Sequence, residues 1–117
     1  MLRIGLGMSY KVGDIVLVKF PFTNLKKSKK RPVLVIKSQN ELNDIVCFQI
    51  TSNSTQSNLL KIQNSDLIDN ILSLESYVKY DKCFTINTEI VDKRIATVNT
   101  TLLNKLKVLF CNELFLK

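Results

Sequence analysis

The sequence predicts one small α+β domain, a curled antiparallel sheet or barrel of short strands with a single C-terminal helix. Runs of β-branched and aromatic residues recur at short intervals along most of the chain, separated by polar turn residues. Near the C-terminus the apolar residues change to three- and four-residue spacing, which is typical of an amphipathic helix. With 117 residues, of which 45% are hydrophobic, the chain can form a single domain around one core.

The first two expected strands are joined by a basic loop. Residues 14–20 alternate apolar and polar side chains, whereas 33–36 is a fully apolar run of the kind found in strands covered on both faces. Pro21 and Pro32 punctuate the connection, and each restricts the residue before it to extended geometry. We therefore expect Arg31 to be extended where the loop re-enters the sheet. Five cations occupy six consecutive positions in this loop: Lys26, Lys27, Lys29, Lys30 and Arg31.

The middle of the chain predicts further strands and one short helical segment. A polar turn at 39–43 leads to a third strand at 44–51, and a polar loop leads to a short strand at 58–62. The apolar spacing within 65–74 is compatible with one or two helical turns. The remaining expected strands are 76–81 and, after a turn near 89, 95–98, and a short apolar run lies between them at 84–86.

The final helix is expected from about residue 101 to 116, with Asn99 or Thr100 as its cap. Residues 13–117 form the predicted domain, and residues 1–12 are expected to be an N-terminal arm in which Met8 is a possible alternative start. No apolar run approaches the ~20 residues that a membrane span requires, so no membrane association is expected.

The charge and the cysteine content indicate which kind of partner and which cellular compartment to expect. The net charge of +7 favours an anionic partner, with a basic but inert surface as the alternative, and the cation cluster favours nucleic acid. An odd number of widely spaced cysteines fits reduced thiols in the cytoplasm. The chain has no histidine and no CxxC pair, so we expect neither a metal site nor a cofactor.

Five segments occur in an order and at a spacing that resemble the PemK/MazF family of toxin–antitoxin ribonucleases. They are GDIVLVKFPFTN, KKRPVLVIKS, FQITS, YVKYDKCFTIN and the closing amphipathic helix. The resemblance implies an SH3-like barrel with a C-terminal helix, a homodimer, and metal-independent, sequence-selective cleavage of single-stranded RNA such as mRNA. It also implies a cognate antitoxin protein whose disordered tail occupies the RNA groove.

The same resemblance assigns roles to individual residues. Arg31 would bind the scissile phosphate, and Thr51 would hydrogen-bond the same group. Asp81 matches the position of a general base, and Lys79 falls where some members place an arginine proposed as general acid. Three positions depart from the pattern, since Lys79 stands in place of that arginine, Lys82 replaces a common glutamine and Phe84 a common arginine. The residues expected to contact RNA are Lys26, Lys27, Lys29, Lys30, Ser52 and Lys82.

The residues present could cleave RNA on chemical grounds alone, without reference to the family. RNA carries its own nucleophile, the 2′-OH, so an enzyme must remove its proton, neutralise the phosphorane and protonate the leaving 5′-oxygen, which yields a 2′,3′-cyclic phosphate. Without histidine, this work falls to a carboxylate such as Asp81 and to cations, and on a strand Lys79 would share its face. Arg31 offers a planar fork for two phosphate oxygens.

Several alternatives remain open from the sequence. Lys79 and Asp81 could form a surface ion pair without a catalytic role. The hydroxyl groups of Thr51 and Ser52 could be plain caps of a strand end. The protein could be a non-catalytic member of the same fold, one that binds RNA without cleaving it or one that poisons a protein such as DNA gyrase, as CcdB does. Four aromatic residues could stack on bases or lie in the core, with the core favoured for the last of them: Phe22, Tyr77, Tyr80 and Phe84.

Overall fold

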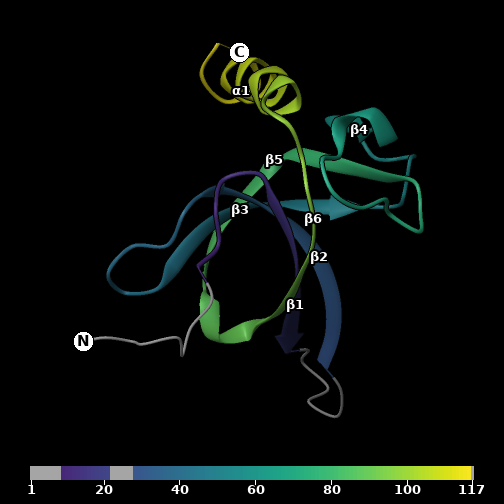
Figure 1. The fold of residues 1–117 in the computed structure, drawn as a ribbon. Coiled ribbons are helices and arrows are strands. Elements are labelled where there is room, and N and C mark those ends of the chain that lie inside the picture. Colours follow the sequence, from purple (N-terminus) through teal and green to yellow (C-terminus); the bar gives the residue numbers. More distant parts are fainter. Residues whose placement is uncertain (1–8, 22–27, 117) are drawn as a thin grey trace.

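The computed structural model describes residues 9–21 and 28–116, which form a curled sheet and one helix (Figure 1). The sheet is antiparallel, with six strands in the order β4-β5-β3-β2-β1-β6. The strands are β1 (Asp14–Pro21), β2 (Ser28–Lys37), β3 (Asp44–Thr51), β4 (Leu59–Ile62), β5 (Ser76–Asn87) and β6 (Val91–Thr97). Two 3₁₀ turns, η1 (Asn64–Asp66) and η2 (Thr88–Ile90), and the helix α1 (Thr100–Phe115) complete the fold. The predicted α+β class is confirmed.

The sheet curls but does not close into a complete barrel, since β4 and β6 are its two edges. The chain that follows η1 crosses to the end of β6. There, Leu67 forms a β-bridge with Val98, and the amide of Ile68 donates to the carbonyl of Thr97 at 2.8 Å. This crossing covers part of an edge that would otherwise expose unpaired backbone groups.

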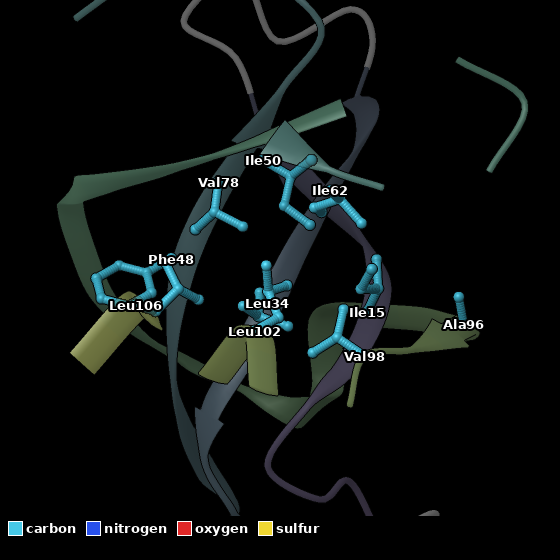
Figure 2. Packing of buried hydrophobic residues seen from close by; sticks show 10 residues of the cluster. All are labelled: Ile15, Leu34, Phe48, Ile50, Ile62, Val78, Ala96, Val98, Leu102 and Leu106. Atoms are coloured by element: carbon cyan, nitrogen blue, oxygen red, sulfur yellow. The ribbon is translucent and has the colours of Figure 1, made fainter. Parts of the chain in front are cut away.

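Helix α1 packs on the curled sheet and fills one apolar side of it. Figure 2 shows ten buried side chains of this cluster, contributed by all six strands, by Val98 and by the helix. Leu102 and Leu106 lie on the inward side of α1 and are almost completely buried. Asn99 caps the helix, since its side chain accepts from the amide of Leu102 at 3.0 Å. The cluster is Ile15, Leu34, Phe48, Ile50, Ile62, Val78, Ala96, Val98, Leu102 and Leu106.

A second apolar cluster occupies the other face of the sheet. Val33 and Val35 belong to this cluster, whereas Leu34 belongs to the first, and all three are buried. The prediction of a strand covered on both faces is therefore confirmed. The buried members of the second cluster are Tyr10, Val16, Val18, Val33, Val35, Ile45, Cys47 and Ile86.

Most predicted elements are confirmed, but four predictions are wrong. The segment 65–74 contains only η1, because the Asp66 carboxylate accepts from the amide of Gln63 and the following residues pair with β6. The segments 76–81 and 84–86 belong to one long strand, β5, and β6 begins earlier than expected, at Val91. Strand β2 begins at Ser28, so Lys29 and Lys30 lie in a strand rather than in a loop, whereas Arg31 is extended in the sheet as predicted.

The expected N-terminal arm is only partly described, since residues 1–8 lie outside the described ranges. Tyr10 is 6% exposed and belongs to the second cluster, and its amide donates to the side chain of Gln39 at 2.9 Å. The described end of this segment is therefore part of the packed domain. Within residues 9–21 and 28–116, no helix is both long enough and apolar enough to span a membrane.

Replacing Gly13 by alanine is expected to lower the free energy of unfolding by about 1–3 kcal/mol. Gly13 has a φ of +98°, and an added Cβ would lie 3.2 Å from the carbonyl oxygen of Val98. The backbone cannot easily move away, because the amide and carbonyl of Gly13 bond Val35 and Val98 at 2.8 and 2.9 Å. Urea denaturation measures the change. Lys105→Ala, on the exposed side of α1, is the control, and equal midpoints for both variants would contradict the prediction.

Candidate active site

The register of the sheet brings most of the predicted site residues to one face. Residues paired directly across antiparallel strands share a face, as do alternate residues along a strand. Val33 of β2 pairs with Gln49 of β3, which pairs with Lys79 of β5. Arg31 lies two residues before Val33 on β2, and Thr51 lies two residues after Gln49 on β3. Because the strands are antiparallel, both residues lie toward the same end of the sheet, and their side chains point to the same face as Val33 and Gln49. We call this side of β2, β3 and β5 the Arg31 face.

A cavity of about 290 Å³ opens on the Arg31 face. It combines one guanidinium, one ammonium and one amide with two aromatic rings. Arg31 is exposed at this cavity, and the pyrrolidine of Pro32 lines it beside Arg31. The cavity is therefore suited to a ligand that is both anionic and aromatic. Its lining residues are Phe20, Arg31, Pro32, Val33, Gln49, Lys82 and Phe84.

A bulge in β5 shapes one end of this face. Cys83 pairs with Phe48, but the next residue of β3, Gln49, pairs with Lys79, so residues 80–82 have no partner in the β3–β5 ladder. Bulges of this kind redirect side chains and are common next to active sites. Here the bulge directs Lys82 to the cavity and brings the carboxylate of Asp81 back to Lys79.

Lys79 and Asp81 form a partly buried ion pair within a wider hydrogen-bond network. The Lys79 Nζ–Asp81 Oδ1 distance is 2.7 Å, and the side chains are 11% and 28% exposed. Lys79 Nζ also donates to the carbonyl of Ser57 at 2.9 Å, and Asn58 Nδ2 donates to the other carboxylate oxygen at 2.9 Å. The two side chains are thus anchored by the loop before β4, which distinguishes them from an isolated surface pair.

This network lowers the pKa of Asp81. The main cause is the hydrogen bond from Lys79, and the bond from Asn58 and the charge of Lys79 act in the same direction against the opposing effect of burial. Asp81 is therefore ionised at neutral pH and able to accept a proton, although the lowered pKa makes it a weaker base than an ordinary aspartate.

Thr51 and Ser52 lie where β3 ends. Thr51 Oγ1 accepts from the amide of Asn53 at 3.0 Å, so the hydroxyl caps the following turn, as the simpler alternative predicts. Its own proton can still be donated to a ligand. Ser52 is exposed just beyond the strand.

The predicted basic residues do not all reach the Arg31 face. Lys29 pairs with Phe20 and shares this face, whereas Lys30 alternates to the other side and forms an ion pair with Asp92 at 3.1 Å. Lys26 and Lys27 lie outside the described residues. In the described part of the chain, no three His, Cys, Asp or Glu side chains lie close enough together to hold a metal ion.

Four residues of this site were not predicted from the sequence: Phe20, Gln49, Ser57 and Asn58. Phe20 and Gln49 have the strand period that places them beside Arg31 and Thr51, but only the register of β1, β2 and β3 makes this visible. Asn58 carries a weak signal, because asparagine tolerates the positive φ of 59° that it adopts at the end of the polar loop.

The comparisons with known proteins identify the family. Residues 11–112 match the model of the PemK-like, MazF-like toxin of type II toxin–antitoxin systems. Because the match spans most of the chain, the protein belongs to this family. No curated protein matches the chain at a significant level.

Solved structures of similar fold agree with the family. A MazE-MazF structure from Deinococcus radiodurans has a TM-score of 0.74 at 15% identity, covering 92% of this chain and 97% of its own. An endoribonuclease in complex with its cognate antitoxin, from a mycobacterial species, has a TM-score of 0.66 at 16% identity, covering 88% and 90%. The Mycobacterium tuberculosis toxin MazF-mt6 has a TM-score of 0.61 at 19% identity, covering 85% and 93%. At these identities the likeness shows the fold.

Proposed function

We propose that this toxin is a cytoplasmic, sequence-selective endoribonuclease that cleaves single-stranded RNA without a metal ion. The observation that carries the proposal is the strand register, which collects Arg31, Thr51 and the Lys79–Asp81 pair on one face of the sheet. Two of the similar structures, both from mycobacterial species, are described as endoribonucleases, which supports the same activity.

In the proposed reaction the 2′-OH attacks the adjacent phosphorus, and the bond to the 5′-oxygen breaks. Asp81 accepts the proton of the 2′-OH, Arg31 and Thr51 bind the phosphorane oxygens, and Lys79 donates a proton to the leaving 5′-oxygen. The products are a 2′,3′-cyclic phosphate and a 5′-OH. No step requires a metal ion, because the nucleophile belongs to the substrate.

The contact between Lys79 and Asp81 explains how this pair would be restored after each turnover. After cleavage, Asp81 holds a proton and Lys79 lacks one. The 2.7 Å separation of Nζ and Oδ1 allows the proton to return directly from the carboxyl to the amine. The ion pair would thus serve as both base and acid without a histidine.

The same proposal includes a homodimer and a cognate antitoxin. One of the similar structures is described as an endoribonuclease in complex with its cognate antitoxin, and another as a MazE-MazF structure. The cations of the Arg31 face suit an acidic antitoxin segment as well as RNA. Sedimentation velocity at micromolar concentration tests the dimer, and a monomer would count against it.

Incubation of a long single-stranded RNA with the wild-type protein in EDTA tests the activity. We expect fragments that end in a 2′,3′-cyclic phosphate, since the scheme requires no metal. Intact RNA that remains bound would indicate an RNA-binding protein without catalysis. Intact RNA without binding would indicate a protein target, such as DNA gyrase.

A further inference from the structure

Two aromatic rings meet at the cavity although their strands are not neighbours. The rings of Phe20 on β1 and Phe84 on β5 have centroids 6.0 Å apart and an interplanar angle of 62°. Strands β2 and β3 lie between β1 and β5 in the sheet. Neighbouring strands are about 4.8 Å apart, so a flat sheet would hold these rings far beyond contact. The curl of the sheet therefore creates this aromatic pair.

We propose that the cavity on the Arg31 face is a nucleobase subsite, in which Phe84 stacks on one base of the bound strand and Phe20, inclined to it at 62°, contacts the edge of that base. The inference rests on the proposed function, because it takes single-stranded nucleic acid as the ligand. Base–aromatic stacking needs an exposed ring surface, and both rings are only half-buried and line the cavity.

The polar groups of the cavity match the other parts of a nucleotide. Arg31 and Lys82 line it together and supply positive charge for the phosphates on either side of a stacked base. The amide of Gln49, which also lines the cavity, can both donate and accept, as the edge of a base requires. Apolar walls, one amide and two cations thus correspond to base, base edge and backbone.

Phe84 determines how this subsite would work. The resemblance to the family places a cation at this position, whereas this chain has an uncharged ring. A ring gains binding energy by stacking and releases no counterions from the RNA backbone, so its contribution does not depend on salt. Both rings also pack against the second apolar cluster, so the test must separate stacking from core packing.

The test uses a single-stranded 2′-fluoro RNA, which lacks the 2′-OH nucleophile, with one 2-aminopurine placed at successive positions. Stacking quenches the fluorescence of 2-aminopurine, and the chain has no tryptophan to interfere. We expect one strongly quenched position with the wild-type protein. Phe84→Leu should abolish this quenching and weaken binding about tenfold, with an unchanged salt slope. Phe84→Tyr keeps an aromatic ring and should retain both the quenching and the wild-type affinity.

Two further variants separate base stacking from the effect of charge and from the loss of an aromatic ring elsewhere. Lys82→Gln should keep the quenching but reduce the slope of log K against log salt by about 1. Phe115→Leu removes a ring that is 72% exposed at the end of α1 and should behave like the wild type. Quenching and affinity that are unchanged in Phe84→Leu would overturn the subsite, as would a wild-type protein that binds no single strand.

Cleavage mapping on natural RNA distinguishes this inference from the proposed function. Phe84→Leu should still cleave but with relaxed preference at one position near the scissile bond, which a purely structural role would not change. A wild-type protein that stacks the base but cleaves nothing would remove the ribonuclease proposal and leave the subsite. Normal cleavage without any quenched position would remove the subsite alone.

Discussion

Arg31→Ala is expected to lower kcat/KM for RNA cleavage by at least about 10²–10³-fold while the protein remains folded. Arg31 lines the cavity, and in the proposed reaction its planar guanidinium binds two oxygens of the phosphorane. Its side chain is exposed, so its removal leaves both apolar clusters intact. Single-turnover cleavage and thermal unfolding together measure the two parts of this prediction.

Arg94→Ala is the matched control, because it removes the same charge from the same sheet. Arg94 lies on β6, where it forms an ion pair with Asp69, and it does not line the cavity. Cleavage by this variant should match the wild type. Arg31→Lys should recover only part of the activity, since an ammonium cannot make the bidentate contact. Cleavage by Arg31→Ala at the wild-type rate would remove Arg31 from the site.

Asp81→Asn is expected to lower the cleavage rate by about 10²–10⁴-fold, because an amide cannot accept the proton of the 2′-OH. The substitution preserves the size of the side chain, and asparagine can still accept a hydrogen bond from Lys79. Wild-type affinity for a 2′-fluoro RNA would show that binding survives. If Asp81→Asn cleaved RNA as fast as the wild type, another group would have to be the base.

The pH dependence of cleavage provides a second test of Asp81. Its pKa lies below the ordinary value of an aspartate, so wild-type kcat/KM should stay constant from neutral pH downward and fall only as Asp81 becomes protonated. Lys79→Met removes the proposed proton donor, so its cleavage should be much slower, and it also removes the main cause of the lowered pKa of Asp81, so the fall in the residual rate should begin at a higher pH. Lys61→Met, which removes the partner of Glu75, should leave the profile unchanged. An identical profile in Lys79→Met would exclude Asp81 as the titrating base.

The confirmed sequence predictions concern local structure. The apolar content of 44–51, the apolar run around Val33 and the helical spacing after Asn99 are patterns that a single segment carries alone, and the strand, the buried strand and the helix are found as predicted. The helical prediction for 65–74 is wrong because pairing with a distant part of the chain prevailed: Leu67 forms a β-bridge with Val98, and the amide of Ile68 donates to Thr97 at the end of β6.

Some features of the candidate site could be predicted from the sequence, and others only from the tertiary structure. The family resemblance identified Arg31, Thr51, Lys79 and Asp81 as candidates, and the strand period of two added that Lys79 and Asp81 share a face. The bulge in β5, the anchoring of the Lys79–Asp81 pair by Ser57 and Asn58, and the meeting of Phe20 with Phe84 were decided by the tertiary structure. Each of these depends on which strands become neighbours and how strongly the sheet curls. Those properties arise from the packing of both faces together, and no single segment encodes them.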